Sequence, residues 1–544
     1  MRAVQERSGP VPSTIGIVGA GTMGSGIAQL AALSGARTLV FDAVPAGLER
    51  GVDKLHENLR RGAERDRWSK EDADAASRRV EAVEGLDALA PCALVIEAIA
   101  ESLEAKRELF AALADAVDPA CVLATNTSSL SVTDLAAAVS GPERVVGMHF
   151  FNPAPLMRLL EVVAGERSGE QALALARGTG EAMGKRVIVA SDGPGFLVNR
   201  CGRPFGLEAQ RVVSEGLATL EQVDRICRLG GGFRMGPFEL SDLVGVDVGF
   251  EVSKSFYAQS YGEPRWRPTL LAHRMAASGR AGRKAGRGWF DYEQDPPWPP
   301  DPDPPAAGSG DDGLLMVGGD SVVADELAGL ARGAGWRVAD PEEAEAAGEV
   351  PFLVLDCGPD EAVVPLQGGP RAVLCAEGSL SGLDPEGGAA GFHAVPPLGA
   401  ARLVEATRGP NTSLLAFERT EHVFGTLGKH VEWVGDAPGM VLGRLVAQLV
   451  NEAAFALRDG IGSAEDIDDG MVLGLNHPRG PLAWGDLMGL DHALAILDAL
   501  FDEHHDPAYR ACPLLRHHVW DGRLGRLTGA GFHEYAETER DPAG

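Results

Sequence analysis

The chain has 544 residues, 45% of them hydrophobic, which is too long for one core and indicates about three to five domains. Its formal net charge of −29, without a Lys/Arg-rich run, argues against nucleic acid and anionic membranes as partners. The seven cysteines form no CxxC pair and no apolar run reaches membrane-spanning length, so we expect a cytoplasmic protein with reduced thiols and no metal site.

A glycine-rich turn follows the first expected strand. The apolar run 14–18 ends in Gly19-Ala20-Gly21-Thr22-Met23-Gly24, and a helical pattern follows from about residue 25 to 34. Gly19 suits a tight turn, Gly21 allows a pyrophosphate to approach the backbone, and Gly24 allows close packing of helix on strand. Phosphates would lie at the helix N-terminus, where N–H groups are free.

An acidic residue completes this motif. A second strand, residues 38–41, is followed by Asp42, which is placed to bind the hydroxyls of an adenosine ribose. Its charge would repel a 2′-phosphate. The sequence therefore predicts a dinucleotide site that prefers NAD to NADP.

Residues 44–85 have a charged helical pattern that includes Arg60, Arg61 and Arg65. These arginines could form a solvated helix face, or they could contact an anionic ligand such as a nucleotide phosphate.

Polar residues lie at the ends of three later strands. Residues 93–100 form a buried strand leading to Glu101 and Lys106, and residues 122–125 lead to Asn126-Thr127-Ser128-Ser129. A third strand, residues 145–150, carries His149 to the same edge, where open α/β sheets bind ligands. Ser128 could instead only cap a helix expected from about Val132.

His149 and Glu161 form a candidate acid–base pair within Gly147–Val163. A neutral imidazole can take a proton near pH 7, and a carboxylate on its other nitrogen would fix the tautomer and stabilise the imidazolium. The alternative is a buried structural histidine with a charge at a strand edge. The dinucleotide motif upstream favours the functional interpretation.

The strand–helix alternation stops near Pro194 and Gly195, and residues 196–276 have a helical pattern. Asn199 lies in the first turns of this region, where it could face a cleft between domains or be a surface amide. Residues 295–313 are rich in proline, which opposes helix and sheet, and predict a semi-rigid linker.

After the linker the chain repeats as a whole module. Residues 234–247 match residues 478–491 at an offset of 244, and at the same offset His149 and Glu161 fall on His393 and Glu405. Apolar stripes at 440–449 and 494–501 could cover the helical domain of the first half.

The second half lacks the glycine motif. Gly318-Gly319-Asp320-Ser321-Val322-Val323 is aligned with Gly19–Gly24, so that Asp320 would put a charge at the pyrophosphate site and Val323 would block close helix packing. Asn199 becomes Gly443, and Lys284 becomes Leu527. We expect this half to bind no dinucleotide, with His393 and Glu405 as remnants.

These motifs resemble those of the L-3-hydroxyacyl-CoA dehydrogenases, and the layout is similar to the long duplicated bacterial form that includes 3-hydroxybutyryl-CoA and 3-hydroxyadipyl-CoA dehydrogenases. The motifs are Gly19–Gly24 with Asp42, Asn126–Leu130, His149–Pro153, Glu161 and Gly193–Arg200. The resemblance implies an α/β plus all-α fold, with a Rossmann domain (1–193), a helical domain (194–294), the linker (295–313), a degenerate Rossmann-like domain (314–436) and a second helical domain (437–544).

The resemblance also implies an activity, the NAD-dependent oxidation of (S)-3-hydroxyacyl-CoA to 3-oxoacyl-CoA in fatty-acid β-oxidation or phenylacetate-type catabolism. His149 would be the general base, Glu161 would orient it, and Ser128 and Asn199 would hold the substrate oxygens and the imidazole. Implied NAD contacts are Gly19, Ala20, Gly21, Thr22, Met23, Gly24, Asp42, Glu101, Lys106, Asn152 and Lys284. The family's CoA-contacting serine and lysine align with Asn58 and Arg65, neither of which keeps the residue type, and Arg65 is assigned to the substrate.

Two other functions remain open. The chain could be an inactive NAD-binding regulatory protein, or a related dehydrogenase of a free hydroxy acid. For the dehydrogenase we expect an acyl-CoA substrate and either a monomer with an internal pseudo-dimer or a homodimer.

Overall fold

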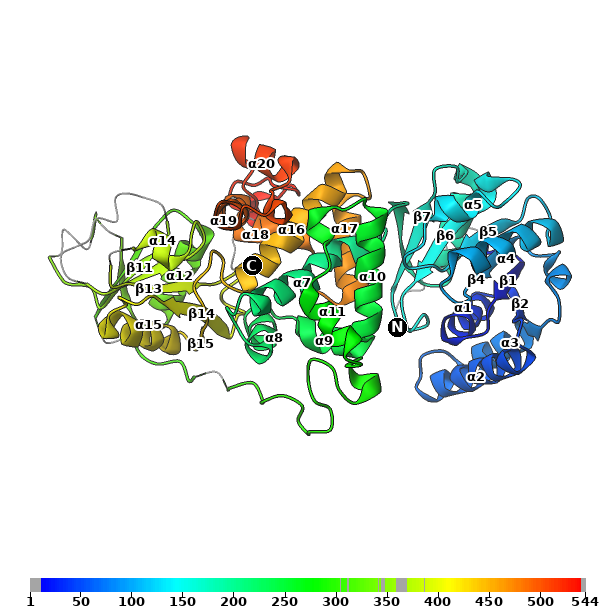
Figure 1. Cartoon of the computed structure of the whole chain (residues 1–544), viewed down its shortest axis with the longest axis horizontal. Coiled ribbons are helices and arrows are strands. Elements are labelled where there is room, and N and C mark those ends of the chain that lie inside the picture. Colours follow the sequence, from blue (N-terminus) through cyan, green and yellow to red (C-terminus); the bar gives the residue numbers. More distant parts are fainter. Residues whose placement is uncertain are drawn as a thin grey trace. The chain divides into compact units, whose positions relative to one another are not determined.

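The computed structural model describes residues 11–303, 305–310, 313–340, 342–343, 348–358, 369–385 and 387–539. The chain forms two compact units, residues 1–200 with 459–475 and residues 201–458 with 476–544 (Figure 1). The first unit therefore combines the N-terminal region with a segment from far along the chain.

An eight-stranded sheet of the Rossmann type forms the centre of the first unit. Its order is β3-β2-β1-β4-β5-β6-β7-β8, and only the β6–β7 pair is antiparallel. The order reverses beside β1, and such sheets bind ligands at the carboxyl ends of the strands at this point. The strands are β1 (Thr14–Val18), β2 (Arg37–Phe41), β3 (Val80–Ala82), β4 (Leu94–Glu97), β5 (Val122–Thr125), β6 (Val145–Phe150), β7 (Leu159–Ala164) and β8 (Arg186–Ser191).

Helices cover both faces of this sheet, because the strands are apolar on both sides. One face packs against α1 (Thr22–Leu33), α2 (Pro45–Glu64), α3 (Lys70–Arg79) and α6 (Glu170–Ala182), and the other against α4 (Leu103–Ala116) and α5 (Val132–Ala136). On α1, Ile27, Ala28 and Ala31 are fully buried in the core that contains Ile15 and Ile17 of β1.

The prediction of one charged helix over residues 44–85 is wrong in part. The chain there forms α2, α3 and the edge strand β3. Helix α2 ends before Asp66, which has a positive φ of 54°, and Ser69 caps α3 by accepting a hydrogen bond from the Asp72 N–H. The short strand β3 forms because it pairs with the edge of the sheet at β2. The local sequence does not show that this edge is available.

The second unit contains a seven-stranded sheet with the order β10-β9-β11-β12-β13-β14-β15 and one antiparallel pair, β13–β14. This is the order of the first sheet without β3. Its elements are β9 (Leu314–Gly318), α12 (Val322–Gly333), β10 (Arg337–Ala339), β11 (Leu353–Asp356), β12 (Arg371–Leu374), α14 (Leu380–Leu383), β13 (Ala390–His393), β14 (Leu403–Arg408), α15 (Leu414–Thr426) and β15 (His430–Trp433).

Two sets of helices follow the two sheets in the same order. The first set is α7 (Val198–Ser214), α8 (Leu220–Leu229), α9 (Pro237–Val244), α10 (Val246–Gln259), the 3-10 turn η3 (Pro264–Trp266) and α11 (Leu270–Ala277). The second set is α16 (Leu442–Arg458), α17 (Ala464–Leu475), α18 (Pro481–Met488), α19 (Leu490–His504), η5 (Pro507–Tyr509) and α20 (Pro513–Trp520). None of the described helices combines the length and apolar character that crossing a bilayer requires.

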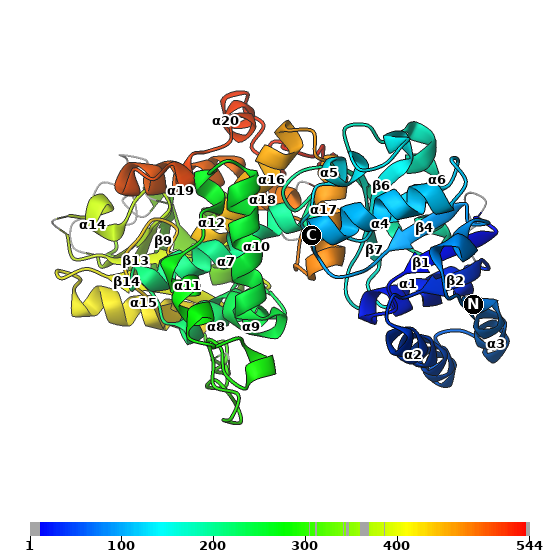
Figure 2. The same cartoon turned by 45° about the vertical axis from the view of Figure 1, so that its right-hand side comes forward.

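The two sets exchange their second helices. In the second unit, α8 packs on β14, and its Arg225 pairs with Glu432 of β15 at 2.9 Å. In the first unit, α17 packs on β7 and β8 (Figure 2), where Arg186 pairs with Asp466 at 2.7 Å and with Asp469 at 2.8 Å. Each sheet is therefore covered by a helix from the other half of the sequence.

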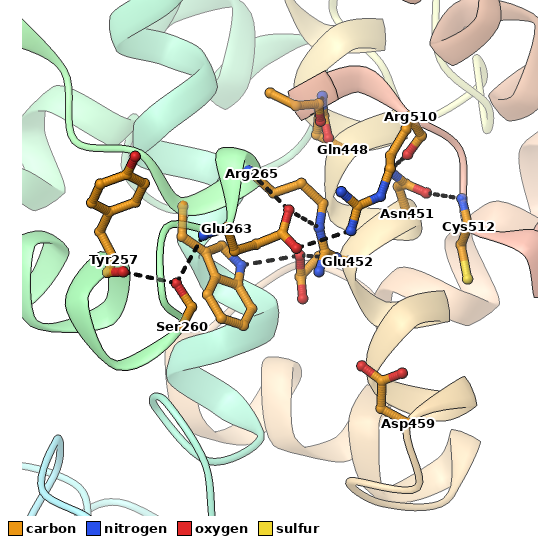
Figure 3. A network of polar contacts seen from close by, with 12 residues as sticks. Tyr257, Ser260, Glu263, Arg265, Gln448, Asn451, Glu452, Asp459, Arg510 and Cys512 are labelled. Carbon is orange, nitrogen blue, oxygen red and sulfur yellow. Dashed lines mark hydrogen bonds and ion pairs between the residues drawn. The ribbon is translucent and has the colours of Figure 1, made fainter. Parts of the chain in front are cut away.

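Buried polar contacts join the two helical sets within the second unit. Arg265 and Trp266 of η3 donate hydrogen bonds to Glu452 of α16 at 2.7 and 3.1 Å (Figure 3). A second buried contact joins α16 to α7, where Arg444 donates a hydrogen bond to Glu208 at 2.8 Å. Removing one partner of a buried ion pair leaves an uncompensated charge, so these contacts favour one specific pairing of the helices.

The proline-rich segment is in neither helix nor strand over its described residues, 295–303, 305–310 and 313. It is held against the first helical set, because Arg228 of α8 pairs with Asp301 at 2.6 Å and the ring of Trp298 lies 5.0 Å from that of Phe290.

Candidate active site

His149 and Glu161 lie opposite each other on the antiparallel strands β6 and β7. The Nδ1 atom of His149 is 2.6 Å from Oε2 of Glu161, and the two residues are only 5% and 0% exposed. An ionised carboxylate can only accept a hydrogen bond, so Nδ1 carries the proton and Nε2 is left as a proton acceptor. The predicted pair is therefore formed, and Glu161 is a buried group rather than a charge at a strand edge.

The other oxygen of Glu161 is held by the start of α7. Oε1 accepts hydrogen bonds from the N–H groups of Leu197 at 3.1 Å and Val198 at 2.9 Å. These two hydrogen bonds fix the orientation of the carboxyl group, so that Oε2 is directed at His149. The preceding residue, Phe196, has a φ of 53°, a conformation that costs a non-glycine residue about 1–3 kcal/mol.

Two aromatic rings flank the imidazole. The ring centroids of Phe151 and Phe196 lie 4.6 and 5.9 Å from that of His149. Both phenylalanines are buried, so they keep water from the sides of the imidazole and fix its plane.

Ser128 and Asn199 come together at the carboxyl edge of the sheet. The side-chain amide of Asn199 donates to the backbone oxygen of Ser128 at 3.4 Å. The cap of α5 is Ser131, which accepts a hydrogen bond from the Asp134 N–H, so the alternative of Ser128 as that cap is wrong. Asn126 accepts a hydrogen bond from the Phe150 N–H at 2.8 Å and thereby ties the Ser128 loop to β6.

Glu101 organises the same loop. Its Oε1 accepts hydrogen bonds from the Thr127 hydroxyl at 2.5 Å and from the Ser128 N–H at 3.0 Å. Lys106, only 1% exposed, bridges Glu101 at 3.0 Å and Glu97 at 2.9 Å. Burial opposes the charge of Glu101, but Lys106 and these hydrogen bonds hold its pKa below the usual value.

The sequence alone does not identify Glu97 as a residue of the site. Its signal is a carboxylate at the end of an otherwise apolar strand, Leu94-Val95-Ile96-Glu97, where it is fully buried. Such a group needs compensation, and Lys106 with the Thr125 hydroxyl, at 2.7 Å, provides it.

The glycine turn fits a dinucleotide. Gly19 has a φ of 99°, and a Cβ added there would lie 2.6 Å from the Ala98 oxygen, while one at Gly24 would lie 1.8 Å from the Gly19 oxygen. A Cβ at Gly21 would meet only open space among the described residues. Asp42 accepts a hydrogen bond from the Ala20 N–H at 2.8 Å, so the turn, the helix N-terminus and the acid form one structure.

The remaining predicted residues are more dispersed. Thr22 and Met23 begin α1, Asn152 is exposed just after β6, and Asn58 and Arg65 lie on α2 and at its end. Arg60 and Arg61 pair with Glu64 and Glu57 at 3.8 and 2.6 Å, which favours the solvated helix face.

Lys284 belongs to the second unit, where it pairs with Asp247 at 2.7 Å, and its contact with NAD stays a prediction.

In the second half the corresponding His–Glu pair is not joined. His393 and Glu405 face each other on β13 and β14, but the carboxyl oxygens of Glu405 accept from the N–H groups of Val441 at 2.7 Å and Leu442 at 3.0 Å. Nε2 of His393 lies 3.2 Å from Nε2 of His492 instead, and within the described part of the chain its Nδ1 has no hydrogen-bond partner.

Gly443, which is aligned with Asn199 of the first half, leaves room for this position of the imidazole. A Cβ at Gly443 would lie 2.3 Å from Cε1 of His393, so the imidazole occupies the space of a missing side chain. Burial and the neighbouring His492 lower the pKa of His393 well below its usual value, and burial raises the pKa of Glu405 to about 8. The two side chains share no hydrogen bond, and their pKa values shift in the directions opposite to those of an ion pair, so they do not form an acid–base pair.

The predicted register of the second glycine turn is wrong by one residue. Strands β1 and β9 begin at 14 and 314, and α1 and α12 begin at 22 and 322, so Gly319, with a φ of 109°, corresponds to Gly19. Ser321 then takes the place of Gly21 and Ala324 that of Gly24. The Ser321 hydroxyl accepts a hydrogen bond from the Ala324 N–H, so a side chain caps the helix end where phosphate would lie.

Comparisons with known proteins agree with this geometry. Residues 14–193 match the family model of the 3-hydroxyacyl-CoA dehydrogenase NAD binding domain, and residues 195–292 and 439–535 both match its C-terminal domain. The chain is 34% identical over 504 residues to 3-hydroxyadipyl-CoA dehydrogenase of Escherichia coli K12, covering 92% of this chain and 96% of that one. It is 38% identical to a probable 3-hydroxybutyryl-CoA dehydrogenase of Bacillus subtilis, covering 51% of this chain and 96% of that one.

A solved structure is similar over nearly the whole length. The crystal structure of 3-hydroxybutyryl-CoA dehydrogenase from Escherichia coli K12 matches with a TM-score of 0.76 and 31% identity, covering 94% of this chain and 99% of that one. The chain therefore belongs to the 3-hydroxyacyl-CoA dehydrogenase family and is an NAD-dependent oxidoreductase.

Proposed function

We propose that the chain interconverts (S)-3-hydroxyacyl-CoA and 3-oxoacyl-CoA, and that only its first half is catalytic. The observation that carries the proposal is the buried His149–Glu161 pair, on the sheet whose glycine turn fits a dinucleotide.

Each residue near the pair has a proposed role. Nε2 of His149 takes the proton of the 3-hydroxyl, and Glu161 stabilises the imidazolium that forms. Ser128 and Asn199 hold the substrate oxygen and the imidazole in line. NAD, when bound, accepts the hydride from C3 of the substrate.

The proposed cofactor site is the turn from Gly19 to Gly24 with Asp42, supported by its uncrowded Gly21 and its helix N-terminus. Glu101, Lys106, Asn152 and Lys284 are further proposed contacts. Of these, Lys106 is better suited to holding Glu101 in place, because it is fully buried. Arg65, exposed at the end of α2, is the proposed contact of the CoA moiety.

The activity is tested by following NADH absorbance with acetoacetyl-CoA, and in the other direction with NAD and 3-hydroxybutyryl-CoA or 3-hydroxyadipyl-CoA. The two hydroxyacyl-CoA esters are chosen because similar proteins are named as their dehydrogenases. We expect turnover of the CoA esters and none of free acetoacetate. Turnover of the free acid alone would support the hydroxy-acid alternative, and NADH binding without turnover would support the regulatory one.

The cofactor preference is a separate prediction. Because the carboxylate of Asp42 would repel a 2′-phosphate, kcat/KM should be at least ~10-fold higher with NADH than with NADPH. Asp42→Asn keeps the size of the side chain and an oxygen that can accept the hydrogen bond from the Ala20 N–H. It should lower the ratio of kcat/KM with NADH to kcat/KM with NADPH. Equal values for the two cofactors in the wild-type chain would mean that Asp42 does not face the ribose.

The number of NADH molecules bound per chain is a further prediction. A fluorescence titration should give one NADH per chain, because Ser321 caps the helix of the second turn. His393→Ala should leave kcat within about twofold, far from the loss that follows removal of a general base. Two bound NADH, or a large rate loss in this variant, would assign a catalytic role to the second half.

We also propose the organisation in five parts, with the second Rossmann-like domain as a degenerate copy of the first, and a place in fatty-acid β-oxidation or phenylacetate-type catabolism in the cytoplasm. The buried contacts between the two helical sets support an internal pseudo-dimer, either as a monomer or within a homodimer.

A further inference from the structure

We propose that α17, a helix of the second half, is a positioning element for the catalytic pair of the first half. The inference rests on the proposed function, because it assumes that His149 and Glu161 act on the substrate.

The backbone of this segment lies directly on side chains beside the pair. A Cβ added at Gly470 would lie 2.9 Å from Leu197 Cδ2 and 3.0 Å from Val198 Cγ2. One at Gly474 would lie 3.0 Å from Val198 Cγ1 and from Leu159 Cδ2, and 3.4 Å from Phe151 Cε1. The two glycines are four residues apart, on one face of the helix, so this face can approach only because it carries no side chains.

The side chains under this face belong to the residues that hold the catalytic pair. Leu197 and Val198 donate their N–H groups to Glu161, and Phe151 packs on the imidazole of His149. Leu159 lies two residues before Glu161 on β7. The helix thus supports both members of the pair through one layer of side chains, which makes it a positioning element rather than a catalytic one.

Polar contacts hold the segment in this place. Arg186 pairs with Asp466 and Asp469, at 2.7 and 2.8 Å. Arg200, only 6% exposed, pairs with Asp459 at 2.6 Å, and it follows Val198 by two residues on α7. The contacts therefore fix α17 to β8 and to the same turn of α7 that binds Glu161.

The strained backbone of Phe196 supports the same interpretation. A φ of 53° at a non-glycine residue persists only where the surrounding packing determines it. Phe196 is itself buried, and the next two residues, Leu197 and Val198, lie under α17 and direct their N–H groups at Glu161.

The test is Gly474→Val in the full-length chain. The added methyl groups must displace Val198, Leu159 or Phe151, and a displacement of about 1 Å at a catalytic group can cost up to 100-fold. We expect kcat to fall at least ~10-fold while the NADH dissociation constant stays within twofold. The matched control is Gly178→Val, a helical glycine of α6 in the same unit where a Cβ would meet open space, and its kcat should stay within twofold.

A second readout separates positioning from general damage. In a His149→Gln background, Gly474→Val should lower the residual rate by less than twofold, because the group that it positions is gone. A full, multiplicative loss in that background would overturn the proposal, as would an unchanged kcat in a Gly474→Val chain that binds NADH.

If the valine variant does not fold, Gly474→Ala takes its place. Its Cβ would lie 3.0 Å from two side-chain carbons, so a shift of a few tenths of an ångström is enough and a smaller loss of kcat is expected. A rate equal to that of Gly178→Val would overturn the proposal. Failure of the proposed function looks different, because the wild-type chain would then not turn over acetoacetyl-CoA, or His149→Gln would keep the wild-type rate.

Discussion

His149→Gln should lower kcat at least ~100-fold and leave the affinity for NADH within about twofold. The Nε2 atom of His149 is the proton acceptor of the site, since Nδ1 is committed to Glu161 at 2.6 Å. A glutamine amide has a similar size but no nitrogen that can take a proton near neutral pH. Steady-state rates with acetoacetyl-CoA and a fluorescence titration with NADH measure the two quantities separately.

The second half provides a matched control. His393 occupies the corresponding position on β13 and is also buried, but it contacts His492 instead of Glu405. His393→Gln should therefore leave kcat within about twofold. A His149→Gln chain with near-normal turnover would remove His149 from the catalytic assignment.

Glu161→Gln should also lower kcat at least ~100-fold. The carboxylate selects the imidazole tautomer with the proton on Nδ1, whereas a glutamine can turn its NH₂ group toward Nδ1 and stabilise the inactive tautomer. It also lacks the negative charge that stabilises the imidazolium. The measurement is kcat with saturating acetoacetyl-CoA and NADH, together with the NADH affinity, which should not change.

Glu405→Gln is the control for this substitution. Glu405 accepts hydrogen bonds from Val441 and Leu442, as Glu161 does from Leu197 and Val198, but His393 is turned away from it. A purely structural role of such a glutamate would make the two substitutions equivalent. We expect Glu405→Gln to keep kcat within about twofold, and equal losses in both variants would contradict the catalytic role of Glu161.

The first sheet and its polar edge could be predicted from the sequence because the information is local. The strands at 14–18, 122–125 and 145–150 are short apolar runs with turn residues beside them, and the structure has the same bounds. The antiparallel β6–β7 pair brings the predicted His149 and Glu161 together, which spacing along the chain could suggest but not establish.

Other features depend on contacts that no local pattern contains. The register of the second glycine turn could not be placed because Gly318 and Gly319 are adjacent, and only the strand pairing selects Gly319 as the turn residue. The rotation of His393 depends on the missing side chain of Gly443, about 50 residues further along. The return of residues 459–475 to the first unit is likewise a tertiary contact between distant segments.

This return has a consequence for how the protein assembles. Arg186 and its partner Asp466 are separated by 280 residues, and Arg200 and Asp459 by 259. Contacts of such sequence separation slow folding, and a nascent chain normally completes its N-terminal domain first. Here synthesis must pass residue 475 before α17 can pack on β7 and β8, so Ile188, Leu197 and Val198 stay without this helix over them until most of the chain has left the ribosome.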